Sequence, residues 1–138
     1  GPACLSRRCP VKHLLLDTHV VLWWLDGATR LGADTRTAIE KPDNYVAVSS
    51  ITAFEIATKK KLGKLRVPDD LATQLEANAF DELPVTMGHG LAAGDLPLHH
   101  RDPFDRLLIA QARLENLTLV TADRSLADYD VPILDAEA

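Results

Sequence analysis

The segment HLLLDTHVVLWWLDG, residues 13–27, places an apolar run directly before an aspartate and a helix-like pattern. We expect a buried strand over residues 13–16 and a helix over residues 18–26. Gly27 can adopt the left-handed conformation that closes a helix, and it therefore predicts the helix end. A strand joined to a helix through one polar residue, here Asp17, is typical of the βα units that build α/β proteins.

Apolar runs continue to alternate with helical periodicity along the chain, which predicts a mostly parallel sheet covered by helices. Further strands are expected at residues 45–48, 83–85, 117–121 and 132–134. Helices are expected at 33–40, 51–62, from the cap signal Pro68-Asp69-Asp70 to Ala79, 87–93 and 104–116, with a helical turn at 125–129 and a loop at 94–103. The predicted core-facing residues are Ile51, Phe54, Glu55, Thr58 and Leu62 in one helix, and Leu107, Ala110, Gln111 and Leu114, with Leu117, in another.

The composition indicates one globular domain over residues 13–138. The chain has 138 residues, of which 46% are hydrophobic and 25% charged, and this excludes a wholly disordered, collagen-like or disulfide-scaffold protein. The charge-free apolar runs are too short to span a membrane. Residues 1–12 are interpreted as a tag remnant, Gly1-Pro2, followed by a loose leader.

The net charge of −5 argues against a protein held to nucleic acid by a broad basic face. It is compatible with a nucleic-acid enzyme whose acidic site holds cations. Both cysteines, Cys4 and Cys9, precede the first periodic segment, so they cannot staple the core, and a reducing cytoplasm is the expected location.

Two aspartates follow predicted strands. Asp17 comes directly after residues 14–16, and Asp123 follows Leu119-Val120. In parallel α/β sheets, binding sites form at the carboxyl ends of strands. Each aspartate taken alone is better explained as a helix cap or turn residue; their pairing favours a site.

A second acidic pair begins the predicted helix 104–116. Asp102 with Pro103 is a common capping arrangement, which explains Asp102 fully. Asp105 lies three residues further on and can face the same crevice. The alternative is that Asp105 interacts only with the helix dipole, with Arg106 as its counter-ion in solvent.

Glu55 lies in the middle of a predicted helix among apolar residues. A buried carboxylate is costly unless it is paired or holds a cation. An exposed pair with Lys59, four residues later, is the alternative interpretation.

If Asp17, Glu55, Asp105 and Asp123 converge, their mutual repulsion requires cations. Oxygen ligands without a required histidine suit Mg²⁺ or Mn²⁺ better than zinc. A site of this kind activates water for in-line displacement at a phosphodiester. The residues therefore predict phosphodiester hydrolysis.

The same residues carry a family resemblance that covers residues 14–134. The chain resembles PIN-domain toxins of the VapC family, which implies a PIN-like three-layer α/β/α fold with a short, mostly parallel central sheet. The matching segments are LLLDTH at 14–19, LWWL at 22–25, FEIA at 54–57, KLGKL at 61–65, LPLHHRDPFDR at 96–106 and LVTAD at 119–123.

The resemblance implies a Mg²⁺- or Mn²⁺-dependent endoribonuclease that is the toxin of a type II toxin–antitoxin pair. Its implied partners are RNA, a VapB-type antitoxin that reaches across the cleft, and a second copy in a homodimer. The acidic positions of the family correspond to Asp17, Glu55, Asp105 and Asp123, with Asp102 as an auxiliary acid. Metal ligation is assigned to Asp17, Asp105 and Asp123, and Thr18 and Thr121 are expected to orient the carboxylates.

Several residues have two interpretations. Lys59 and Lys60, in a run that continues to Lys61, Lys64 and Arg66, can contact RNA phosphates or form a solvated face, and Arg106 is a further candidate for RNA binding. His99 and His100 resemble a ligand pair, but adjacent side chains point apart, which favours a loop-shaping role. Trp23 and Trp24 can stack on bases or cover a partner helix. At least one of them is expected in the core, and an exposed remainder favours protein contact over RNA.

Two other functions remain open at this stage. A phosphatase or phospho-acceptor domain also places aspartates at strand ends, but it gives Glu55 no role. A non-catalytic module that binds RNA or an antitoxin arginine would need no metal.

Overall fold

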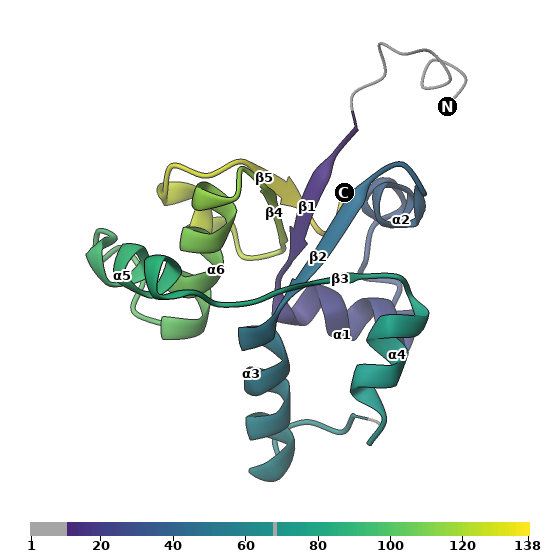
Figure 1. Ribbon diagram of the computed structural model, residues 1–138. Coiled ribbons are helices and arrows are strands. Elements are labelled where there is room, and N and C mark those ends of the chain that lie inside the picture. Colours follow the sequence, from purple (N-terminus) through teal and green to yellow (C-terminus); the bar gives the residue numbers. More distant parts are fainter. Residues whose placement is uncertain (1–10, 68) are drawn as a thin grey trace.

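The computed structural model describes residues 11–67 and 69–138. Within them, five strands form one sheet in the order β3-β2-β1-β4-β5, and every neighbouring pair is parallel (Figure 1). The strands are β1 (His13–Leu16), β2 (Tyr45–Ser49), β3 (Asp81–Leu83), β4 (Thr118–Thr121) and β5 (Ile133–Asp135). The predicted α/β class with a parallel sheet is confirmed.

Helices connect the strands and cover both faces of the sheet (Figure 1). They are α1 (Thr18–Asp26), α2 (Ala33–Glu40), α3 (Ser50–Lys61), α4 (Leu71–Ala77), α5 (Met87–Asp95) and α6 (Pro103–Leu114), and the 3₁₀ helix η2 (Arg124–Asp128) follows β4. Leu14 and Leu16 pack with α1 and α2 on one face, whereas Leu15 packs with α6 on the other. A strand buried on both faces needs a continuous apolar run, which β1 has.

The first βα unit has the predicted bounds. Asp17 caps α1, because its carboxylate accepts a hydrogen bond from the Val20 N–H at 2.9 Å. Gly27 closes the helix in the left-handed conformation, with φ of 63°. The predicted helix at residues 33–40 is also confirmed.

Several element boundaries differ from the prediction, most of them by one or two residues. Strand β3 runs from Asp81 to Leu83 and shares only Leu83 with the predicted strand at 83–85, because Pro84 has no N–H to donate to a ladder. Helix α4 stops at Ala77, and Ala79 has a left-handed φ of 57°. Helix α5 continues to Asp95, so the predicted loop at 94–103 begins later.

The predicted apolar faces of two helices are partly wrong. Phe54 and Leu62 of the 51–62 segment are 60% and 62% exposed, and Leu114 of α6 is 52% exposed. Helix α3 continues away from the end of β2 and does not lie flat on the sheet (Figure 1). Its buried residues are Thr52, Glu55 and Ile56, so the side of α3 that faces the protein contains the carboxylate.

Residues 1–10, which contain most of the predicted leader and both Cys4 and Cys9, lie outside the described residues. Parallel pairing reaches back to Lys12, whose carbonyl accepts a hydrogen bond from the Tyr45 N–H. Among the described residues, no helix combines the length and the apolar character that a membrane crossing requires.

Candidate active site

The acidic residues gather where β1 and β4 end. The order of the strands reverses here, because the chain passes from β1 to β2 on one side and returns with β4 on the other. Such switch points are where open α/β sheets bind ligands. Asp17 follows β1, Asp123 follows β4, and helices α3 and α6 contribute Glu55 and Asp105.

Asp17 is buried, with 7% of its surface exposed. Burial raises its pKa above the ordinary value, and the nearby Glu55 charge acts in the same direction. The Thr121 hydroxyl and the Val20 N–H partly offset this effect. The Thr121 hydroxyl also accepts a hydrogen bond from the Asp123 N–H at 3.0 Å, so this one hydroxyl lies between the two strand-end aspartates.

Glu55 is both buried and paired, so each of its two interpretations holds in part. The carboxylate is 6% exposed. Thr18 donates its hydroxyl proton to one oxygen at 2.6 Å, and the Lys59 ammonium lies 2.6 Å from the other. The structure thus fixes Glu55 between a hydroxyl and a cation at the edge of the site.

Asp102 and Asp105 have different environments at the start of α6. Asp102 is exposed and caps the helix, accepting from the N–H groups of Phe104 at 2.8 Å and Asp105 at 3.3 Å. Asp105 is half-buried, and its pKa is raised to about 6. Burial is the largest cause of this increase, and the negative charge of Asp102 is the second. The charge of Asp17 contributes in the same direction, so Asp17 lies near enough to Asp105 for their charges to interact.

His100 is the site residue whose position was not predicted. Its Nε2 lies 2.9 Å from an oxygen of Asp105 and 3.5 Å from an oxygen of Asp123. The His99 ring instead packs edge-on against Tyr129. The adjacent histidines do point apart, as expected, but one of them enters the site. Its place two residues before the Asp102 cap is the sequence signal that could have identified it.

Arg106 does not face the site, which corrects two expectations. It is 8% exposed, and its guanidinium donates to main-chain carbonyls, including those of Pro97 and His100 at 3.0 Å. Because the guanidinium is buried among these acceptors, it is neither a solvent counter-ion for Asp105 nor available to bind RNA.

The two lysines proposed for RNA binding both form ion pairs. Lys59 pairs with Glu55, and Lys60 pairs with the exposed Asp69. Both are about one-third exposed. Lys59 therefore lies at the edge of the acidic site, whereas Lys60 points to the segment before α4.

Trp23 and Trp24 are half-buried and pack against the core cluster around β1. Arginine side chains cover both rings: Arg30 lies 4.5 Å from the Trp23 ring centre and Arg36 lies 5.6 Å from that of Trp24. The prediction that the pair belongs at least partly to the core agrees with this packing.

The donor set fits a divalent cation. One ligand atom each from His100, Asp105 and Asp123 lies within 4.8 Å of the others. Burial is the main cause of the raised pKa values of Asp105 and Asp17, and neighbouring carboxylate charges add to it. A bound cation would favour the ionised form of both groups. The Thr18 hydroxyl donates to the Glu55 carboxylate, and the Thr121 hydroxyl accepts from the Asp123 N–H. Hydrogen bonds of this kind orient the groups that bind a metal.

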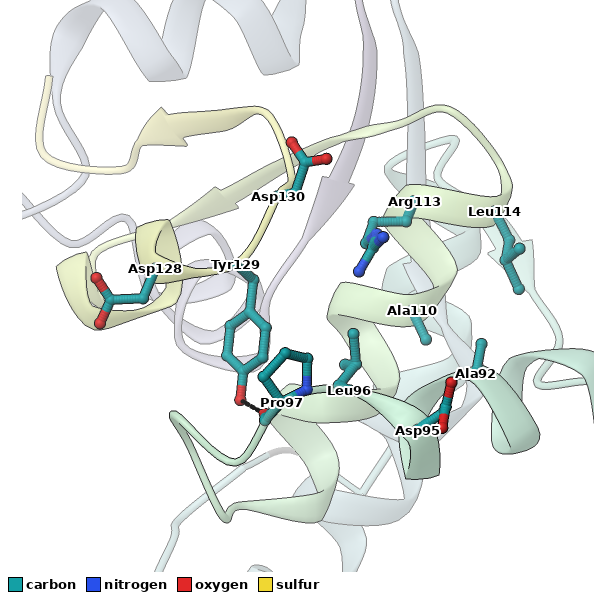
Figure 2. Close-up of a pocket in the computed structure, with 10 residues that line it drawn as sticks. All are labelled: Ala92, Asp95, Leu96, Pro97, Ala110, Arg113, Leu114, Asp128, Tyr129 and Asp130. Atoms are coloured by element: carbon teal, nitrogen blue, oxygen red, sulfur yellow. Dashed lines mark hydrogen bonds between the residues drawn. The ribbon is translucent and has the colours of Figure 1, made fainter.

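A separate cavity of about 530 Å³ lies between α5, α6 and the segment after η2, and Tyr129 is one of the residues that line it. Figure 2 shows Arg113 and three aspartates, Asp95, Asp128 and Asp130, around it. None of the predicted site residues lines this cavity.

The fold and the acidic switch point define a known class. The family model of the PIN domain matches residues 14–132, so the chain belongs to the PIN-domain family. It is 32% identical over 122 residues to Ribonuclease VapC22 of Mycobacterium tuberculosis, an alignment that covers 86% of this chain and 93% of the relative. The predicted VapC-type PIN domain is thereby confirmed.

Solved structures agree on the fold. A toxin-antitoxin complex from Klebsiella pneumoniae is 19% identical, with a TM-score of 0.64, and the match covers 89% of this chain and 97% of that one. VapBC2 from Rickettsia felis, bound to a DNA fragment from its promoter, is 16% identical with a TM-score of 0.66, covering 88% and 97%. These similarities show the three-layer PIN fold.

Proposed function

We propose that this protein is a metal-dependent endoribonuclease and the toxin of a toxin–antitoxin pair. The observation that carries the proposal is the acidic cluster at the β1/β4 switch point. Ligand atoms of His100, Asp105 and Asp123 lie within 4.8 Å of one another, the Glu55 charge acts on Asp17, and the Asp17 charge acts on Asp105. Similarity to a protein named a ribonuclease supports the activity, and similarity to toxin-antitoxin complexes supports the biological setting.

Asp17, Asp105 and Asp123 would hold Mg²⁺ or Mn²⁺. When bound, such a cation supplies charge neutralisation of the phosphodiester and lowers the pKa of water. Around it, the hydroxyls of Thr18 and Thr121 keep the carboxylates oriented. Asp102, which caps α6, keeps Asp105 at the start of that helix.

Glu55 has a role in positioning water. Thr18 and Lys59 fix its two oxygens, yet each carboxylate oxygen has a second lone pair that can accept a hydrogen bond. Glu55 would therefore orient the attacking water and take up its proton. Lys59 would attract an RNA phosphate to this edge, while Lys60 would add to the basic surface further along α3.

The antitoxin would place a basic side chain among the carboxylates, because a guanidinium pairs well with crowded acids. A homodimer stays a prediction. Met87 and Leu91 on α5 are 87% and 78% exposed, and exposed apolar surface of this kind is what a second copy covers.

The proposal is tested by incubating purified protein with total tRNA and rRNA in Mg²⁺, in Mn²⁺ or in EDTA. Asp17→Asn should abolish cleavage and keep the fold, since asparagine also caps helices. Asp43→Asn removes the same charge from the exposed turn before β2, at the opposite end of the sheet, and should cleave normally.

Fragments that require metal and disappear in Asp17→Asn would support the nuclease. Metal-independent RNA binding without any product would contradict it and favour a non-catalytic binding module. Equal cleavage by Asp17→Asn and the original protein would also contradict it.

A further inference from the structure

The histidine in the acidic site is held there by its own loop. The His100 N–H donates to the Tyr129 hydroxyl at 2.8 Å, and the His100 carbonyl accepts from Arg106 at 3.0 Å. Both polar groups of the main chain are thus fixed by side chains from other elements. The main chain at His100 is therefore held in place beside Asp105 and Asp123.

The same two anchors fix the rest of the loop between α5 and α6. The buried Arg106 guanidinium donates to the carbonyls of Ala93 and Leu96, each at 2.8 Å. The Tyr129 hydroxyl donates to the Pro97 carbonyl at 2.8 Å, as the dashed line in Figure 2 shows. Burying an arginine for this purpose is costly unless its donors are satisfied, and here several carbonyls satisfy them. The loop is therefore built to present His100.

The Nε2 atom of His100 is the part of the ring that faces both carboxylates. In the absence of a cation, Nε2 lies within hydrogen-bond distance of Asp105, at 2.9 Å. A cation placed among the three groups would meet one nitrogen and at least two oxygens, because their ligand atoms already lie within 4.8 Å of one another.

We propose that His100 is a nitrogen ligand of the cation, and that the site consequently prefers a transition metal to Mg²⁺. This inference rests on the proposed metal-dependent function and concerns the same site. Magnesium takes oxygen ligands and keeps its waters, whereas imidazole is a good ligand for first-row transition metals. Manganese, which accepts both oxygen and nitrogen, is the probe that separates the two cases.

The test is metal binding by purified, metal-free protein without RNA. Isothermal titration calorimetry should give a dissociation constant for Mn²⁺ at least about tenfold below that for Mg²⁺. His100→Asn should weaken Mn²⁺ binding by about 10- to 100-fold, the range that loss of a group supporting a metal ligand already reaches, and should leave Mg²⁺ binding nearly unchanged. His13→Asn, on an exposed residue at the start of β1, is the matched control.

Pulsed electron paramagnetic resonance of the Mn²⁺-loaded protein detects the nitrogen directly. Coupling to an imidazole nitrogen should be present in the original protein and in His13→Asn, and absent in His100→Asn. Lack of that coupling in the original protein would overturn the proposal, and so would an equal loss of Mg²⁺ and Mn²⁺ binding in folded His100→Asn. The latter result would make His100 a positioning residue for Asp105.

The two proposals fail separately. Nitrogen coupling without RNA cleavage would refute the nuclease and leave the histidine ligand standing. RNA cleavage without nitrogen coupling would refute the ligand and leave the nuclease standing. A circular dichroism melt of each variant establishes that it is folded before the metal is added.

Discussion

The two sides of the acidic site differ in how their charge is compensated. On the α3 side, the Glu55 carboxylate already has a lysine cation and a hydroxyl at 2.6 Å. On the α6 side, Asp105 and Asp123 share one histidine, and the pKa of Asp105 is raised to about 6. The α3 side thus contains a lysine cation beside its carboxylate, whereas the two aspartates of the α6 side have the His100 imidazole between them.

This difference assigns separate tasks to acids that look equivalent in the sequence. A carboxylate that is already neutralised gains little from a metal ion, so Glu55 suits the positioning of water or substrate. A carboxylate whose charge is poorly compensated gains more, so Asp105 and Asp123 suit cation binding. Changes to the acids of the α6 side should therefore weaken both metal binding and activity. Changes to Glu55 or Lys59 on the α3 side should lower activity and stability and leave metal binding nearly unchanged.

Among changes on these two sides of the site, the largest effect is expected from Asp105→Asn, which removes the least compensated charge. RNA cleavage should fall at least about 100-fold, above the cost of losing a group that only supports a metal ligand. Asp102→Asn is the control at the same helix start, because asparagine retains the cap, and it should lose less than about tenfold. Steady-state cleavage rates measure both, and equal losses would contradict the division of tasks.

Arg106→Met should be the most destabilising change on the α6 side. It leaves several carbonyls of the α5–α6 loop without their donor, and each unpaired buried group costs about 1–3 kcal/mol. We expect a loss of at least about 3 kcal/mol in the free energy of unfolding, measured in urea. Arg113→Met, on the exposed end of the same helix, should cost less than about 1 kcal/mol.

Lys59→Met should lower the free energy of unfolding of the protein by about 1–3 kcal/mol, because it leaves the buried Glu55 carboxylate with one hydroxyl partner. In a Glu55→Gln background the same change should cost little, and this double-mutant cycle isolates the pair. Lys61→Met, two residues further on and exposed, provides the control. Additive costs for Lys59→Met and Glu55→Gln would show that the pair contributes nothing.

The smallest effect is a pH dependence of the metal-free protein. Asp105 has a pKa of about 6 when folded, against an ordinary 3.8. Between these values the folded state binds more protons, so stability should fall as pH rises from about 4 to 6. The slope for one group stays below about 1.4 kcal/mol per pH unit. Urea melts in EDTA should show a shallower slope for Asp105→Asn, with Asp17 still contributing in the same direction.

The sequence predicted the elements whose ends carry local chemical signals. Asp17 marks the start of α1 and Gly27 its end, and the structure follows both. Asp102 and Pro103 mark the start of α6 in the same way. Asp17 and Asp123 could be located because each follows a strand, and Asp105 because it begins a helix; parallel strands bring such positions to one edge. Glu55 was found by a different signal, a carboxylate among apolar residues in the middle of a helix.

Other features depend on contacts that no periodic pattern encodes. Arg106 appears in the sequence as one more charged residue on a helix, yet it is buried because it meets carbonyls of the preceding loop. Arg106 also holds the main chain of His100 through its carbonyl. The apolar positions Phe54 and Leu62 do not mark the buried side of α3, since that helix turns Glu55 toward the site.

The parallel pairing of β1 with β4 also sets an order of events during synthesis. Asp17 and Glu55 emerge from the ribosome early, but Asp105 and Asp123 follow only in the last quarter of the chain. β4 must then settle beside a strand made about a hundred residues before it, and such long-range pairing is slow to form. A nascent chain therefore carries an incomplete acidic site, and the assembled cluster belongs to the nearly finished protein.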